Sequence, residues 1–353
     1  MPIHPQPVSA EPPLLRRLQT LCRGAELPGL GARLADLADL VAPDMVALEA
    51  SMPRLRPEAS AVERSASHLL DLGGKRLRPM CVALAARLGG GFDERTKQLA
   101  LAVELVHAAT LLHDDVVDVG ETRRGAPTAR LIFGNAVSIF AGDYLLVDAL
   151  KRVRQARVDG VLDRLLDVLE EMILAESLQL ERRGRLDTTE AQWFSIVEGK
   201  TAALFRFGMW AGARAGGADP DQCAVLERFG ADLGVAFQAI DDLLDLAGDP
   251  DKTGKALFAD LREGKLTYPV IVSLERDRGL TAVIEEIVAA ETPDPRTCRE
   301  ALERIERTGS LRDGRKLAQM HADRAKRTIE DLPPSRARDA LRTVADATIH
   351  RPA

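Results

Sequence analysis

The sequence predicts an all-α protein in which one large helical domain carries the function. Hydrophobic residues make up 46% of the 353-residue chain and aromatic residues only 4%. From about residue 57 almost to the C-terminus, apolar residues recur with the period of an α-helix. No alternating run rich in β-branched residues is bounded by turns, and no segment repeats at a fixed period. This balance favours helices that pack through aliphatic side chains.

The elements follow in order from an N-terminal extension, residues 1–50. Residues 1–13 hold five prolines and are expected to form a disordered tail. Residues 14–52 have the pattern of one or two amphipathic helices. Residues 51–353 form the main domain, broken at Gly73-Gly74, at 120–127 and at 248–264. Its predicted helices are 57–71, 78–89, 94–118, 134–158, 160–183, 188–198, 201–215, 221–247, 265–277, 280–290, 296–307, 310–331 and 334–349.

Composition excludes several classes of protein. The formal net charge of −6 provides no basic field for nucleic acid. The four cysteines are scattered without a C-x-x-C pair, which argues against a zinc site or a disulfide framework and fits a reducing compartment. No signal peptide is visible, and no uncharged apolar run reaches the ~18 residues needed to span a bilayer. We therefore expect a soluble, cytoplasmic protein.

Two aspartate-rich segments, L-L-H-D-D-V-V-D and Q-A-I-D-D-L-L-D, carry the central signal. The first and last aspartates of each segment are four residues apart, so they share one face of a helix. Paired carboxylates one turn apart suit Mg²⁺, which prefers hard oxygen ligands together with water and phosphate. The carboxylates are those of Asp114, Asp115 and Asp118 in the first cluster and Asp241, Asp242 and Asp245 in the second.

A single D-D-x-x-D segment is most often a solvated acidic face of a helix. Here leucine, isoleucine and valine surround both segments, and a helix that is apolar on nearly all sides is buried. Buried like charges repel one another unless cations neutralise them. We therefore expect two helices that face each other across a metal-filled cavity.

Basic residues occur in several loops near these clusters. The segment G-G-K-R-L-R-P places cations in a glycine-containing turn before a helix, where the backbone can approach an anion. Arg123-Arg124-Gly125 forms a second cationic loop after the first cluster. Either loop alone reads as an ordinary surface patch. Together with two metal-type clusters, they favour a diphosphate site.

Seven segments resemble the trans-isoprenyl diphosphate synthase family, and they occur in family order over roughly residues 57–350. They are G-G-K-R-L-R-P, H-A-A-T-L-L-H-D-D-V-V-D, R-R-G-A-P-T, G-D-Y-L-L, E-G-K-T, F-Q-A-I-D-D-L-L-D and D-L-R-E-G-K. The resemblance is strongest to long-chain, octaprenyl-type synthases. It implies the isoprenoid synthase fold, with antiparallel helices around a deep central cavity, and a homodimer.

The resemblance also implies roles for individual residues. Isopentenyl diphosphate would be held by Lys75, Arg78, His107 and Arg124. About three Mg²⁺ ions would be bound by Asp114, Asp118 and Asp241, supported by Asp115, Asp242 and Asp245. The phosphates of the allylic diphosphate would contact Arg123, Lys200, Lys255 and Lys265. Thr201 and Gln238 would lie beside the developing carbocation, and Gln179 would line the cavity.

The activity implied by the family is the Mg²⁺-dependent head-to-tail condensation of isopentenyl diphosphate with an allylic diphosphate. Thr110 lies one turn before Asp114, and its neighbour Ala109 is also small. Aromatic residues at these places form a floor in short-chain members of the family. The absence of an aromatic floor predicts a product longer than geranylgeranyl diphosphate. Such a product could go to the membrane.

Four alternatives stay open at this stage. The chain could be a geranylgeranyl or a farnesyl diphosphate synthase. A terpene cyclase also ionises allylic diphosphates, but it has one aspartate-rich cluster of this kind and needs no isopentenyl site. A non-catalytic subunit of a heteromeric synthase would have lost carboxylates or cations, whereas this chain retains all of them.

Overall fold

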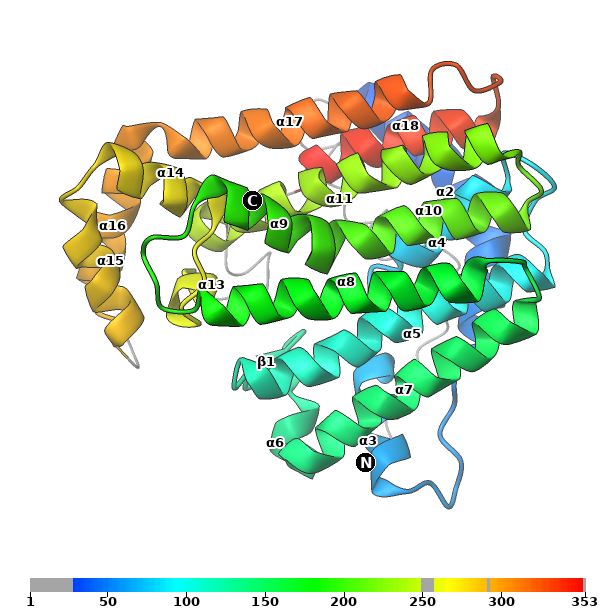
Figure 1. Cartoon of the computed structure of the whole chain (residues 1–353), viewed down its shortest axis with the longest axis horizontal. Helices are drawn as coiled ribbons and strands as arrows, with labels where there is room; N and C mark the ends of the chain where they lie inside the picture. Colours follow the sequence, from blue (N-terminus) through cyan, green and yellow to red (C-terminus); the bar gives the residue numbers. More distant parts are fainter. Residues whose placement is uncertain (1–27, 249–256, 291–292, 352–353) are drawn as a thin grey trace.

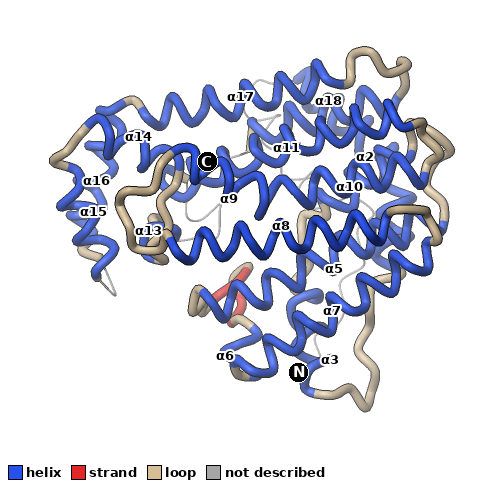
Figure 2. The backbone as a smooth tube through the Cα atoms, viewed as in Figure 1, coloured by secondary structure: helices blue, strands red, loops and turns tan. Residues whose placement is uncertain are grey.

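The computed structural model describes residues 28–248, 257–290 and 293–351, and within these ranges the chain is almost entirely helical. The only strands among them are β1 (Thr122–Arg123) and β2 (Ala126–Pro127), which form an antiparallel hairpin. Figure 2 shows this hairpin in red beside the end of α5. The helices are α2 (Pro28–Ala50), α3 (Ala61–Asp71), α4 (Leu77–Ala86), α5 (Glu94–Val117), α6 (Ala129–Phe133), α7 (Asn135–Ala156), α8 (Val161–Glu181), α9 (Glu190–Val197), the π-helix η1 (Glu198–Ala202), α10 (Ala203–Ala215), α11 (Pro220–Ala247), α13 (Ala259–Arg262), α14 (Tyr268–Arg276), α15 (Leu280–Ala289), α16 (Pro295–Thr308), α17 (Ser310–Thr328) and α18 (Arg336–Ile349).

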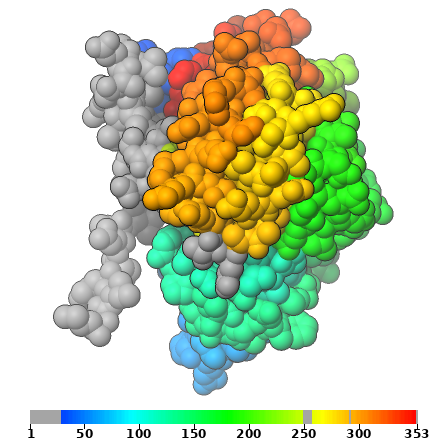
Figure 3. Space-filling model, turned by 90° about the vertical axis from the view of Figure 1, so that its left-hand side faces the viewer, coloured from blue at the N-terminus to red at the C-terminus, as the bar shows by residue number. Residues whose placement is uncertain are grey.

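Long helices run lengthwise through the molecule and pack around a common core (Figure 1). α5 packs against α7 and α4, while α11 packs against α10 and α17. The largest fully buried side chains of this core include Phe205, Phe207 and Phe229. The short helices α14, α15 and α16 gather at one end of the molecule, where they cover the upper part of the face seen in Figure 3. The prediction of an all-α fold is confirmed.

The two helices that carry the aspartate clusters begin at strong capping residues. The Asp93 carboxylate accepts the Thr96 N–H at 2.9 Å at the start of α5, and Asp219 forms a capping box with Gln222 at the start of α11. Each helix then continues to its aspartate cluster at the C-terminal end. The carboxylates therefore lie at the negative ends of two helix dipoles, where cations are favoured.

Four details differ from the predicted elements, and two of them are the short helices α6 and α13, which lie between predicted helices. The segment expected to separate the helices 188–198 and 201–215 is the π-helix η1, which continues directly from α9 into α10. The break predicted at 120–127 contains the short β-hairpin, which the sequence pattern did not indicate.

Helix α2, which belongs to the extension predicted from the sequence, is packed into the main core. Its Leu34, Val41 and Leu48 side chains are fully buried in the largest hydrophobic cluster of the protein. The prediction for the tail before residue 28 lies outside the described residues. No described helix is both long enough and apolar enough to cross a membrane.

Candidate active site

The first aspartate of the first cluster faces a lysine from the π-helix. Lys200 Nζ lies 3.6 Å from Asp114 Oδ2, and it also donates to Gln179 Oε1 at 2.9 Å and pairs with Glu176. Burial raises the pKa of Asp114 to about 6, and the nearby charge of Lys200 opposes this shift. Burial therefore disfavours the ionised form of Asp114, and a further positive charge beside it would stabilise that form.

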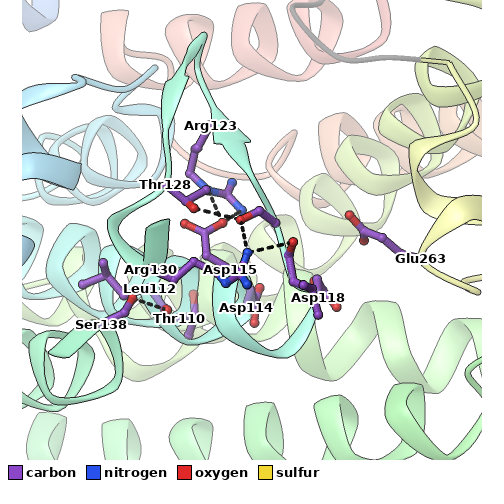
Figure 4. A network of polar contacts seen from close by, with 12 residues as sticks. Thr110, Leu112, Asp114, Asp115, Asp118, Arg123, Thr128, Arg130, Ser138 and Glu263 are labelled. Carbon is purple, nitrogen blue, oxygen red and sulfur yellow. Dashed lines mark hydrogen bonds and ion pairs between the residues drawn. The ribbon is translucent and has the colours of Figure 1, made fainter. Parts of the chain in front are cut away.

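The other two aspartates of this cluster have ion-pair partners of their own. Asp115 is buried, and its Oδ1 accepts a hydrogen bond from Arg123 Nε at 2.8 Å (Figure 4). Asp118 accepts from Lys265 Nζ at 2.6 Å and pairs with Arg183 at the end of α8. Burial by itself lowers the pKa of Lys265, but Glu263 and Asp118 raise it overall, so this lysine stays charged.

The middle aspartate of the second cluster is held by uncharged donors. The carboxylate of Asp242 accepts hydrogen bonds from Trp193 Nε1 at 2.8 Å, Gln238 Nε2 at 2.9 Å and the Tyr268 backbone N–H at 3.0 Å. Burial raises the pKa of Asp242 to about 7, even though these three hydrogen bonds favour the ionised form. The protein itself thus uses both carboxylate oxygens of Asp242.

The outer aspartates of the second cluster contact other parts of the chain. Asp241 Oδ1 accepts from Arg351 Nη1 at 2.7 Å, and the guanidinium of Arg351 stacks 3.9 Å above the ring of Phe237. Asp245 Oδ1 accepts the backbone N–H of Asp260 at 3.2 Å. The last described residue of the chain, Arg351, thereby reaches the second cluster.

Two segments connect the clusters directly. In the π-helix, Lys200 faces Asp114 of the first cluster, while Thr201 Oγ1 donates to Gln238 Oε1 of α11 at 3.0 Å. A Cβ on Gly234 of α11 would lie 2.4 Å from Ala202 Cα, so only glycine allows this close approach. The segment 258–265 contacts Asp245 at its start and Asp118 at its end. The two aspartate clusters therefore belong to one site.

Several arginines lie near His107 on α5. Burial lowers the pKa of His107 well below its usual value, and the positive charges of Arg78, Arg124, Arg123 and Arg76 lower it further. The guanidinium of Arg78 lies over the Phe205 ring at 4.6 Å, and its Nε has no hydrogen-bond partner in the described part of the chain. A neutral histidine among four arginines provides hydrogen-bond donors and positive charge suited to a multiply charged anion.

The donor set at the clusters fits a hard divalent cation. Within the described ranges, no three carboxylate, histidine or cysteine side chains converge closely enough to hold a metal by themselves. The buried Oδ2 atom of Asp115 nevertheless lacks a hydrogen-bond partner among those residues. Carboxylate oxygens on two helices are ligands that Mg²⁺ prefers. The ion completes its coordination sphere with water and substrate phosphate.

The structure brings most of the predicted site residues together. Lys75 lies exposed in the turn before α4, Gln179 contacts Lys200, and Lys255 lies outside the described residues. Ala109 is buried, and the partly buried Thr110 donates its hydroxyl to the His107 carbonyl at 2.8 Å.

Sequence reasoning missed several partners of these residues: Glu176, Arg183, Trp193, Tyr268 and Arg351. None of them stands in a motif, so no local signal identifies them. Glu104 is different, because a single charge within the apolar run L-A-V-E-L-V indicates a buried ion pair. The structure shows that pair, with Arg76.

Comparison with known proteins gives one consistent result. A family model described as polyprenyl synthetase matches residues 59–305. The chain is 34% identical to a short chain isoprenyl diphosphate synthase from Methanothermobacter thermautotrophicus over 294 residues, which cover 82% of this chain and 90% of the relative. It is 32% identical to octaprenyl diphosphate synthase from Escherichia coli over 324 residues, covering 90% of this chain and 99% of the relative.

A solved structure agrees with these relatives. A polyprenyl synthase from Caulobacter crescentus, crystallised in complex with calcium and isoprenyl diphosphate, superposes with a TM-score of 0.80 at 33% sequence identity. The superposition covers 98% of this chain and 100% of the other. The arrangement of helices described above is thus shared along nearly the whole chain.

Proposed function

The chain belongs to the polyprenyl synthetase family and is a transferase that makes trans-polyprenyl diphosphates, and on this basis we propose that it elongates an allylic diphosphate with isopentenyl diphosphate in a Mg²⁺-dependent reaction. One observation carries the proposal. The aspartate clusters at the ends of α5 and α11 belong to one site, in which Lys200 and Lys265 pair with the first cluster, and a separate group of arginines surrounds His107. Two anionic substrates thus have two distinct cationic sites.

In this proposal Asp114, Asp118 and Asp241 hold the metal, and Asp115, Asp242 and Asp245 support them. A bound divalent cation would neutralise negative charge on the departing diphosphate. Lys200 and Lys265 then serve as phosphate ligands, because each already lies within 3.6 Å of a cluster carboxylate. Asp242 acts as a positioning residue, since protein donors saturate its carboxylate.

The chemistry follows from the charges that the residues supply. The allylic carbon–oxygen bond breaks, and its electron pair leaves with the diphosphate that the cations of the site stabilise. The double bond of isopentenyl diphosphate, positioned by Lys75, Arg78, His107 and Arg124, attacks the allylic cation. The released diphosphate then accepts the proton that the new cation loses, and the new double bond forms. In this proposal the hydroxyl of Thr201 and the amide of Gln238, which are hydrogen-bonded to each other at 3.0 Å, would stabilise the developing positive charge with their dipoles.

We assign a product longer than geranylgeranyl diphosphate. Ala109 and Thr110 leave small side chains on the face of α5 one turn before Asp114, and no aromatic ring stands there to stop the growing tail. The named relatives include both short-chain and octaprenyl synthases. Phenylalanine at position 109 should therefore shorten the product.

A homodimer is part of the proposal. Exposed apolar side chains form stripes on α7 and α8, including Phe140 at 59%, Ile173 at 68% and Leu174 at 62% exposure. Apolar stripes of this kind on neighbouring helices mark an interaction surface. Sedimentation analysis should give a dimer, and Ile173→Lys should shift it toward the monomer.

The experiment that tests the function uses purified protein, Mg²⁺, labelled isopentenyl diphosphate and four separate primers. The primers are dimethylallyl, geranyl, farnesyl and geranylgeranyl diphosphate, and the dephosphorylated products are sized by chromatography. A ladder that ends above twenty carbons supports both the reaction and the open floor. A single short product refutes the length assignment, and no incorporation by folded protein refutes the reaction.

A further inference from the structure

The turn that precedes α4 holds two residues in the left-handed region of the backbone. Gly73 has φ +71°, and Arg76, the residue before the helix, has φ +50°. Glycine adopts this conformation readily, whereas for a residue with a side chain it costs about 1–2 kcal/mol. Such strain persists only where the surroundings hold the residue in place. The turn therefore needs an explanation for the conformation of Arg76.

Two carboxylates, the partly buried Glu49 and the buried Glu104, provide that explanation. Arg76 Nε donates to Glu49 Oε1 at 2.6 Å, and its Nη1 donates to Glu104 Oε1 at 2.5 Å. The Arg76 side chain is only 7% exposed. Burial by itself lowers the pKa of Arg76, but the two glutamates raise it overall, so the guanidinium stays charged. Because protein carboxylates neutralise that charge, Arg76 positions the turn and leaves substrate binding to its neighbours.

The neighbours of Arg76 are the proposed ligands of isopentenyl diphosphate. Lys75 precedes it and Arg78 follows two residues later. A Cβ added to Gly74 would lie 3.3 Å from Arg124 Nη2, from Arg76 Nη1 and from Glu104 Oε1. The guanidinium of Arg124 thus packs against the same turn. A shift of the turn would move three of the four proposed ligands at once.

Glu49 belongs to α2, which lies outside residues 59–305 that the family model matches. Helix α2 holds α4 at both ends. At the far end, Arg87 donates to Asp44 through Nε at 2.6 Å and Nη2 at 2.7 Å. Of these two ion pairs, only Glu49–Arg76 lies in the turn beside the arginines near His107. Variants of the two pairs therefore distinguish a general role in helix packing from a role in the site.

We propose that Glu49 is a positioning residue for isopentenyl diphosphate, so that α2 forms an outer part of this substrate site. Through Arg76, Glu49 sets the backbone of the turn that presents Lys75 and Arg78. The inference rests on the proposed function, because it assigns a role in binding one of the two substrates.

The test compares Glu49→Gln with Asp44→Asn as a matched control in the full-length protein. We expect Glu49→Gln to raise KM for isopentenyl diphosphate about tenfold. This is the size of effect typical of a residue that holds a ligand-binding side chain in position. KM for the allylic primer should change less than about twofold, since the ion pair of Glu49 is with Arg76 in the turn before α4. Asp44→Asn should lower the midpoint of thermal unfolding without changing either KM. Glu49→Asp should restore part of the binding.

Two outcomes would overturn the inference: equal changes in both KM values for Glu49→Gln, or the same rise in KM for Asp44→Asn. Thermal unfolding of each variant shows whether it folds, and Glu49→Asp provides a second variant with the charge retained. If the unaltered protein lacks elongation activity, the proposed function fails. If it elongates normally and Glu49→Gln does too, only the role of Glu49 fails.

Discussion

The two aspartate clusters share one spacing, yet their surroundings differ. In the first cluster the middle residue, Asp115, pairs with the charged Arg123. In the second, the middle residue, Asp242, accepts three hydrogen bonds from the uncharged donors of Trp193, Gln238 and Tyr268. A carboxylate held by three neutral donors is fixed in place, whereas one paired with a charged side chain can exchange partners when a ligand binds. Equal spacing thus does not mean equal roles.

The residues upstream of the clusters differ in the same way. Seven residues before the first aspartate, α5 has His107 and α11 has Gly234. Four residues before it, α5 has Thr110 and α11 has Phe237, whose ring is covered by Arg351. At these positions α5 therefore carries a histidine and a small polar side chain, while α11 carries a glycine and a ring that an arginine covers. The predictions below test this asymmetry.

The largest predicted effect is the difference in kcat between variants of Asp114 and of Asp242. We expect Asp114→Asn to lower kcat about 10³-fold, because it removes a charge that acts at the reacting diphosphate. Asp242→Asn should lower kcat only about tenfold, since its role is to position neighbours. Single-turnover rates at saturating Mg²⁺ measure both, and circular dichroism verifies folding. Similar losses in the two variants would mean that the clusters are equivalent.

Product length should depend on the α5 side. Ala109→Phe places a ring one turn before the cluster, and we expect the longest product to shorten by several isoprene units because the tail meets a floor. Chromatography of the dephosphorylated products gives the distribution. Thr110→Phe serves as the companion variant on the adjoining position. An unchanged ladder in both variants contradicts growth of the tail along this face.

The indole of Trp193 should contribute to stability more than to catalysis. Trp193→Phe removes a donor to the buried Asp242 carboxylate and should lower the free energy of unfolding by about 1–3 kcal/mol. Trp210→Phe is the matched control, because Trp210 contacts the Arg164 guanidinium through its ring at 5.8 Å. We expect a loss below about 1 kcal/mol there. Urea unfolding at pH 8 measures the free energy of unfolding of both variants. Equal losses would mean that the indole N–H of Trp193 makes no special contribution to stability.

The smallest effect should be a pH dependence that arises from His107. Its pKa is lowered in the folded protein, so below about pH 6.5 the unfolded chain binds a proton that the folded chain does not. Stability from this group is therefore present above pH 6.5 and falls as the pH decreases, by less than about 1.4 kcal/mol per pH unit. His107→Gln should flatten the profile of unfolding free energy between pH 5 and 8. If His107→Gln keeps the original slope of unfolding free energy against pH, other titratable groups cause that slope.

Motifs and periodicity predicted the fold class, both clusters and the basic loops. The reason is local: helical period, the four-residue spacing of aspartates and glycine-containing turns are written in short stretches of chain. The β-hairpin at 122–127 escaped prediction because strands of two residues have no periodic signal. The π-helix escaped because a single widened turn changes no pattern of apolar residues.

The order of residues was enough to predict two acidic clusters on long helices and the basic turns that accompany them. The packing of the helices sets which cation pairs with which carboxylate. Lys265 reaches Asp118 across 147 residues, Arg351 reaches Asp241 across 110, and Glu49 holds Arg76 from a helix outside the matched region. Such pairs depend on how helices pack side by side, and helix packing brings together residues that no local pattern relates.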